Sequence, residues 1–326
     1  IGRNTERLLL DDGFDLKTFI FDTKGHQLIP DERAVGRLAI EVKNDTALII
    51  SAGSGVLNDL AKFISYKTGI PYIIVATAPS MDGYASVVSP LIVGGVKTTC
   101  EGTYPLSIIG DTHILKDAPM EMLQAGFGDM LGKLIALADW DLARELGKEG
   151  YCETIARLVR SAFKKCADNI DGIVRRDEKA IGYLMEGLVL SGITIGLYGS
   201  SRPASGAEHS FAHYWDMDAI ARGEEHPLHG NSVGVGTVVA AHVYEMMKPH
   251  LPQGVEAPRP EEVTGFLSSL GSCDNPRDLG ISRELFIESM YEAYKLKTRY
   301  GIFNLVVEKG MLDEITDSLT RRFYDR

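Results

Sequence analysis

The feature that most constrains the fold is a change of hydrophobic pattern about one third of the way along the chain. Up to about residue 115, short β-branched and apolar runs alternate with segments of helical periodicity. Strands are predicted at residues 18–22, 46–51, 71–76 and 106–110, and helices at residues 5–10, 31–43 and 56–68. Because strands alternate with helices, we expect βαβ units and a parallel, Rossmann-like sheet of the kind that binds nucleotides.

From residue 117 onward the strand patterns disappear. Apolar residues recur three and four positions apart, which predicts an all-helical second part. The predicted helices are residues 129–146, 151–170, 178–197, 205–220, 231–247, 260–270, 283–294 and 311–323, with a Pro-rich connector at 249–260. We therefore expect two domains, an α/β domain over residues 1–116 and a helical domain over residues 117–326.

The beginning of the chain adds one expectation about the sheet. Residues 1–6 contain neither an initiating Met nor the apolar core of a signal peptide. A nucleotide-binding domain normally opens with a strand, whereas here the first predicted strand follows a helix. We expect that the first strand of the sheet precedes residue 1.

Charge and cysteine content exclude several classes of protein. The chain has 34 basic and 45 acidic residues, a net charge of -11, which opposes nucleic acid or an anionic bilayer as a partner. An anionic substrate would need a local basic pocket. The four cysteines form no C-x-x-C pair, as expected of a cytoplasmic protein. The longest apolar stretch, residues 187–199, is shorter than the ~20 residues that span a membrane, so we expect no transmembrane helix.

Two turns that follow predicted strands carry groups suited to a nucleotide. Residues 51–59, SAGSGVLND, join a strand to a helix, where free backbone N–H groups and the helix dipole attract phosphate. A G-x-G turn alone is more often only a tight turn. Residues 77–86, TAPSMDGYAS, follow the next strand at the edge where parallel sheets bind ligands. Within them, Asp82 could accept a hydrogen bond from a substrate hydroxyl.

The helical part contains a candidate metal site. His209 and His213 lie four residues apart on one predicted helix face, and His229 begins another helix. Asp129 is predicted at a helix start with Lys133 one turn later, a pattern that by itself indicates a cap and its salt bridge. Since five of the eight histidines lie between His209 and His242, the cluster indicates a site with three ligands and one open position.

Together these motifs resemble the iron-containing alcohol dehydrogenase and dehydroquinate synthase-like superfamily, and within it the bacterial sn-glycerol-1-phosphate dehydrogenases. The matching segments cover about residues 45–245, and the run at 79–83, PSMDG, is the most discriminating. The resemblance implies a dehydroquinate synthase-like fold and NAD(P)H-dependent reduction of dihydroxyacetone phosphate to sn-glycerol 1-phosphate. It also implies one divalent metal, zinc, nickel or iron, bound by Asp129, His209 and His229, with His226 as the rival of His229.

The resemblance implies further site residues. The cofactor contacts would be Gly53, Gly55, Val56, Leu57, Asn58, Asp59, Thr77, Ala78, Pro79, Ser80 and Ser86. Asp82, Asp129 and His213 would contact the substrate, and His213 or a water that it holds would donate the proton. Because the chain is acidic, we expect Lys97, Lys133 and Arg202 to supply the cations for the phosphate, with Lys133 also taking part in catalysis.

Other functions remain open from the sequence. A dehydrogenase of glycerol or another unphosphorylated polyol and a dehydroquinate synthase-like lyase use a similar metal triad. A nucleotide-binding protein without turnover is also compatible with the fold. In each case a homo-oligomer, a dimer or larger, is expected.

Overall fold

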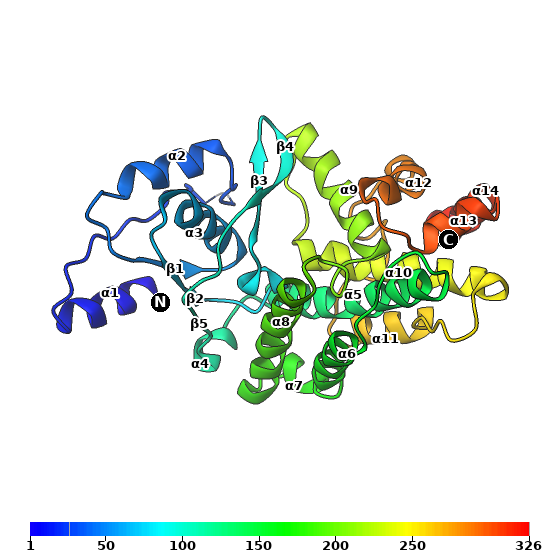
Figure 1. The fold of residues 1–326 in the computed structure, drawn as a ribbon, viewed down its shortest axis with the longest axis horizontal. Helices are drawn as coiled ribbons and strands as arrows, with labels where there is room; N and C mark the ends of the chain where they lie inside the picture. The colour runs from blue at the N-terminus through cyan, green and yellow to red at the C-terminus, as the bar shows by residue number, and fades with distance from the viewer. Residues whose placement is uncertain (26, 326) are drawn as a thin grey trace.

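The computed structural model describes residues 1–25 and 27–325, and its two parts follow the predicted change of pattern (Figure 1). Every strand among these residues lies in the first third of the chain. The strands are β1 (Ile49–Gly53), β2 (Tyr72–Ala76), β3 (Val88–Val93), β4 (Val96–Glu101) and β5 (Ser107–Ile109). The helices α1 (Gly2–Asp11), α2 (Glu32–Glu41) and α3 (Gly55–Thr68) accompany them. The predicted fold class, an α/β part followed by a helical part, is confirmed.

The parallel sheet places two turns at one edge. Its strand order is β1-β2-β5, and β1 pairs with β2 so that Gly53 lies opposite Ala76. The segments that leave these two residues, the turn into α3 and the loop that holds η1 (Asp82–Ala85), therefore begin side by side. This is the edge where parallel sheets bind ligands.

A β-hairpin, β3 with β4, was not predicted from the sequence. The strands are antiparallel and joined by Gly94 and Gly95, whose φ angles are 60° and 80°. Two consecutive positive φ angles define the turn that best matches the twist of a hairpin, and glycine adopts them without strain. The Gly-Gly pair between two β-branched runs was the signal that could have revealed it.

The strand predicted at residues 18–22 is absent; this segment is extended but joins no ladder. Within it, Phe21 packs against the small cluster formed by Ala34, Leu60 and Leu91, whereas Ile20 is exposed. A β-branched and aromatic run forms a strand only where a sheet edge lies within hydrogen-bonding reach.

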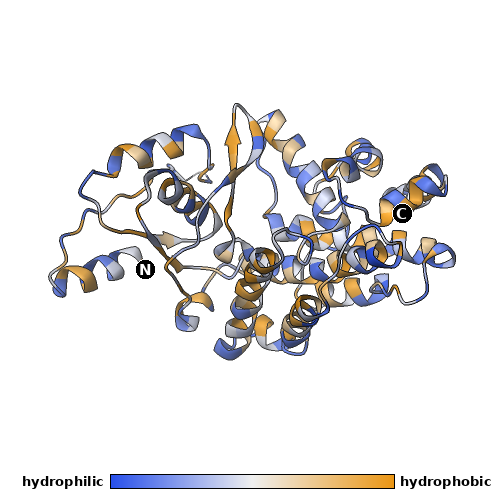
Figure 2. Ribbon diagram, viewed as in Figure 1, coloured by the Kyte–Doolittle hydropathy of each residue, from blue (hydrophilic) through white to orange (hydrophobic). Residues whose placement is uncertain are grey.

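The second part is helical throughout. Its helices are α4 (Thr112–Leu115), α5 (Met120–Glu145), α6 (Glu153–Ala167), α7 (Ile170–Val174), α8 (Glu178–Tyr198), α9 (Ala207–Arg222), α10 (His229–Met247), η2 (Lys248–His250), α11 (Pro260–Ser269), α12 (Arg283–Glu292), η3 (Ala293–Leu296), α13 (Ile302–Glu308) and α14 (Leu312–Tyr324). Along most of them hydrophobic and hydrophilic residues alternate, which gives each helix an apolar face for the core (Figure 2). α5 and α10 pack against each other at the centre, and nearly all of α10 is buried.

One helix, α8, is long and apolar enough to cross a membrane by length and composition alone. Half of its most apolar window is buried inside the protein, as in the core helix of a globular fold. Its contacts include α6 and the loop around η1.

Candidate active site

The close approach of α5 and α10 creates the site. A Cβ on Gly128 would overlap the carbonyl group of Gly230, and a Cβ on Gly230 would overlap that of Ala125. Without side chains at these crossing points the two backbones come together, so Asp129 and His229, the neighbours of the two glycines, meet at the interface. Asp129 was expected at a helix start, but it lies in the middle of α5, which begins nine residues earlier.

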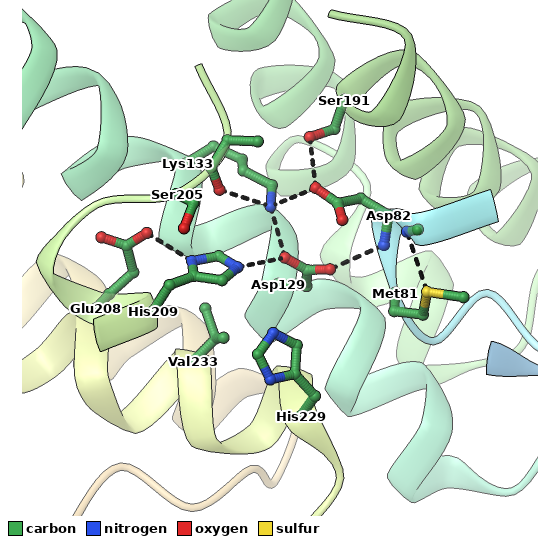
Figure 3. A network of polar contacts seen from close by, with 12 residues as sticks. Met81, Asp82, Asp129, Lys133, Ser191, Ser205, Glu208, His209, His229 and Val233 are labelled. Carbon is green, nitrogen blue, oxygen red and sulfur yellow. Dashed lines mark hydrogen bonds and ion pairs between the residues drawn. The ribbon is translucent and has the colours of Figure 1, made fainter. Parts of the chain in front are cut away.

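Asp129 is the centre of a buried polar network (Figure 3). Its Oδ1 accepts from Lys133 Nζ at 2.5 Å, and its Oδ2 accepts the backbone N–H of Asp82 at 2.9 Å. Lys133 Nζ also donates to Asp82 Oδ2 at 2.8 Å and to the carbonyl oxygen of Ala204 at 3.0 Å. Ser191 Oγ completes the network by donating to the same oxygen of Asp82 at 2.9 Å. The loop of the α/β part is thereby tied to the helical part.

The two histidines present their free nitrogens toward this carboxylate. His209 Nε2 lies 3.5 Å from Asp129 Oδ1, while its Nδ1 lies 2.6 Å from Glu208 Oε1. The rings of His209 and His229 are 5.3 Å apart. Ligand atoms bound to one tetrahedral zinc ion at about 2.0–2.1 Å lie roughly 3.3 Å apart, so the spacing of Asp129 and His209 fits one ion. A carboxylate on the remote imidazole nitrogen, as Glu208 provides, is the usual support of a metal ligand.

A second group of possible ligands shares His229. One ligand atom each of His213, Asp216 and His229 lies within 4.8 Å of the others. Asp216 Oδ2 is 3.5 Å from His229 Nδ1, and it also accepts from Lys97 Nζ at 2.7 Å. Lys97 stands on β4, so this ion pair joins the hairpin to α9 beside it (Figure 1). The rival histidine, His226, lies 3.7 Å from the same carboxylate.

The charges in the site perturb its ionisable groups. Burial raises the pKa of Asp129, but Lys133 and His209 outweigh it, and the pKa lies far below its ordinary value. Asp216 behaves in the same way: burial raises its pKa, but Lys97, His229 and His226 together outweigh burial and lower it. Desolvation lowers the pKa of His213 well below its usual value, and the Lys97 ammonium adds to the effect. At neutral pH this imidazole is therefore uncharged.

The candidate cofactor residues divide into two groups. A broad cleft between the parts is lined by residues of both turns and by three histidines of the site, whereas Asp82, Asp129 and His209 are not among its lining residues. The predicted cofactor residues that line it are Gly55, Val56, Leu57, Asp59 and Ser80, joined by Ser54, Met81, Lys97, His213, His226 and His229. The other predicted cofactor residues, Gly53, Asn58, Thr77, Ala78, Pro79 and Ser86, are not among the lining residues.

Two residues of this second group, Asn58 and Ser86, take part in hydrogen bonds that support the turns from inside the protein. Asn58 is fully buried and donates to the carbonyl oxygen of Gly83 at 3.2 Å. Lys62, which had been assigned no role, is buried on α3 and donates to Gly83 and to Ser86 at 2.8 and 3.1 Å. These bonds fix the loop at 77–86 against α3, so they set the shape of the cleft without facing it.

Two of the three cations predicted to bind a phosphate, Lys133 and Arg202, are already bonded to other groups of the protein. Lys133 is completely buried and its ammonium is used by the acceptors of the central network. Arg202, 2% exposed, pairs with Glu149 at 2.9 Å and donates to the carbonyl oxygens of Asp139 and Tyr300. Lys97 does line the cleft, but it is paired with a buried carboxylate.

Three residues of the site escaped the sequence analysis. Glu208 and Asp216 are buried carboxylates on α9 that face histidines, and Ser191 is a buried hydroxyl on α8. Glu208 could have been found, because it precedes a predicted ligand in the sequence. The other two carry no such local signal, since their partners are distant in sequence.

Comparisons with known proteins show the family to which the chain belongs. Residues 1–119 match the family described as iron-containing alcohol dehydrogenase. A glycerol-1-phosphate dehydrogenase [NAD(P)+] of Bacillus velezensis is 35% identical over 296 residues, 86% of this chain and 75% of that protein. One of Thermococcus kodakarensis is 33% identical over 280 residues, 86% of this chain and 74% of that protein.

Solved structures share the fold. Glycerol dehydrogenase from Schizosaccharomyces pombe superposes with a TM-score of 0.68 at 18% identity, covering 99% of this chain and 82% of that one. Sulfoacetaldehyde reductase from Bifidobacterium kashiwanohense, in complex with NAD+, gives 0.71 at 15% identity, covering 98% and 88%. At such identities the likeness concerns the fold alone.

Proposed function

We propose that this chain, which belongs to the glycerol-1-phosphate dehydrogenases of the iron-containing alcohol dehydrogenase family, reduces dihydroxyacetone phosphate to sn-glycerol 1-phosphate. In this reaction NAD(P)H gives a hydride to the ketone carbon and a proton reaches the ketone oxygen, so the products are the alcohol and NAD(P)+. The observation that carries the proposal is that His209 Nε2 lies 3.5 Å from Asp129 Oδ1, with the ring of His229 centred 5.3 Å from that of His209, beside the cofactor turns.

The donor set suits a divalent metal. One carboxylate and two imidazoles leave one position open, and His209 is already oriented by Glu208. When bound there, the metal would polarise the ketone and stabilise the negative charge that develops on its oxygen. The group of His213, Asp216 and His229 is the alternative set; among the described residues no carboxylate orients His213, and Asp216 is already paired with Lys97.

Two residues would act on the substrate. Asp82 is held through Oδ2 by Lys133 and Ser191, and its Oδ1 has no partner among the described residues, so it can accept from a substrate hydroxyl. His213 stays neutral and lines the cleft, so its ring has one N–H and one acceptor nitrogen with which to relay a proton through a water. The turn after β1 supports a role for Gly55, Val56 and Leu57 at the dinucleotide.

The direct test is NAD(P)H oxidation by the zinc-, nickel- or iron-loaded protein with dihydroxyacetone phosphate, followed by chiral analysis of the product. We expect sn-glycerol 1-phosphate. Equal turnover of free dihydroxyacetone would point to a polyol dehydrogenase, and the opposite enantiomer would refute the assignment.

Further proposals concern the setting of the enzyme. We propose that residues 1–116 form a cofactor domain and residues 117–326 a helical metal- and substrate-binding domain. We also propose that the protein is a homo-oligomer and that it lies in the cytoplasm. Light scattering of the purified protein tests the oligomer, and limited proteolysis tests the division.

A further inference from the structure

The cations around the site differ in how their charge is neutralised. Lys97, Lys133 and Arg202 each lie within 3.0 Å of a carboxylate oxygen. Lys297 and Arg299, which lie between η3 and α13, have no ion pair among the described residues. In this they differ from the three cations that the sequence predicted for the phosphate.

Lys297 lies next to the helix that carries the candidate ligand His209. Its Nζ donates to Ser205 Oγ at 2.5 Å and faces the carbonyl oxygen of Gly206 at 3.4 Å, and both acceptors are neutral. Ser205 and Gly206 immediately precede α9. Repulsion from this ammonium is one of the smaller causes of the low pKa of His213, the residue proposed to act on the substrate.

Arg299 is a second cation without an ion pair among the described residues. Its Nη1 is buried and has no hydrogen-bond partner among the described residues. Burial lowers the pKa of Arg299, and the neighbouring Arg202 lowers it further. A buried guanidinium nitrogen without an acceptor is costly unless a ligand supplies one.

The carboxylates nearby do not fill this need. Asp139 is already engaged, because its two oxygens accept hydrogen bonds from Tyr244, Ile302 and Ala207. Glu208 uses Oε1 for Gly206 and His209, and its Oε2 makes no hydrogen bond. Burial, followed by repulsion from Arg299, lowers the pKa of Lys297 to about 7 despite these two acids.

We propose that Lys297 and Arg299 bind the phosphate of the substrate and so determine the preference for a phosphorylated over a free triose. The inference rests on the proposed function, because it concerns the same site and the same reaction. A phosphate dianion accepts several charge-assisted hydrogen bonds and would supply the missing counter-charge of both side chains.

The test compares Lys297→Met and Arg299→Met with Lys297→Arg and with the control Lys295→Met. Lys295 lies two residues from Lys297 but is half exposed and paired with Glu292. The readout is the ratio of kcat/KM for dihydroxyacetone phosphate to that for dihydroxyacetone. We expect the ratio to fall about 10-fold or more in each of the first two variants, as for loss of a charged hydrogen bond, and to be kept in the last two.

Calorimetry with inorganic phosphate separates this inference from the proposed function. At pH 8 the wild-type protein should bind phosphate with uptake of a proton, since the anion raises the pKa of Lys297 from about 7. Lys297→Met should bind more weakly and without uptake. If phosphate binds in this way but dihydroxyacetone phosphate is not reduced, the proposed function fails, whereas the anion site of Lys297 and Arg299 is retained. An unchanged substrate ratio, or no phosphate binding by the wild type, overturns the inference.

Discussion

Two clusters of one lysine, one aspartate and one histidine meet at the candidate site, and they are built differently. In the inner cluster, Lys133, Asp129 and His209 all come from the helical part and are 0%, 1% and 5% exposed. In the interdomain cluster the lysine, Lys97, comes from the hairpin of the α/β part and crosses to Asp216 on α9. Members that sit on packed helices keep their geometry, whereas a cluster that joins two parts changes when the parts move.

The difference assigns separate roles to the two carboxylates. Asp129 faces His209 and the loop that holds Asp82, so it lies where metal and substrate would meet. Asp216 faces the remote nitrogen of His229, so it would orient that candidate ligand, and its ion pair with Lys97 joins the hairpin to α9. Four predictions can break or sharpen this comparison.

The largest effect is expected from replacing each of the two carboxylates by an amide, one at a time. Asp129→Asn should lose bound metal and roughly 1000-fold or more in kcat/KM, because a three-ligand site cannot spare its carboxylate. Asp216→Asn should keep stoichiometric metal with about 10–100-fold weaker affinity, the usual cost of losing an orienting partner. Elemental analysis and metal titration measure both. Loss of metal in Asp216→Asn with retention in Asp129→Asn would assign the metal to the other group.

Next come the residues expected to act on substrate without holding the metal. Asp82→Asn and His213→Ala should each lose roughly 100-fold or more in kcat/KM, as for acid-base groups, with metal and cofactor binding retained. The melting temperature is measured alongside. A loss of activity that merely follows a loss of stability would show that these side chains only support the fold.

The two lysines should differ in their effect on stability. Lys133→Met leaves Asp129 and Asp82 charged and unpaired inside the protein, and we expect a loss of about 3–5 kcal/mol in the free energy of unfolding. Lys97 is 19% exposed at its side chain and borders the cleft, so Lys97→Met should cost less. Denaturant titration of the metal-free proteins compares them. Equal losses would contradict the distinction between a rigid and an interdomain cluster.

The smallest effect is on acid stability. Because the pKa of Asp216 is lowered in the folded protein, its contribution to stability is complete above its ordinary value of about 4 and is lost as the pH falls further. Asp216→Asn should therefore flatten the dependence of the unfolding free energy on pH below about 4. Asp218→Asn, on the same helix and paired with Arg222, is the control. If the unfolding free energy depends on pH equally in wild type and Asp216→Asn, the ion pair of Asp216 does not contribute to acid stability.

The sequence predicted more of the architecture than of the hydrogen bonds and ion pairs within the site. Periodicity is a local property, so the parallel strands after residue 45 and most of the long helices could be read from it. The hairpin and the loss of the strand at 18–22 depended on turn geometry and on available sheet edges. The helix start expected at Asp129 was wrong, because α5 continues through the glycines that precede Asp129 and let neighbouring backbone approach the helix.

What the sequence determined by itself is the order of strands and helices, the turns at the sheet edge, and the residue types from which a metal site can be made. Only the tertiary structure decided which cations are neutralised and which remain available. Lys97 meets Asp216 across 119 positions, while Lys133, a predicted phosphate ligand, is consumed by buried carboxylates. The physical reason is that a charge is paired through space, at distances of a few ångströms that spacing along the chain does not encode.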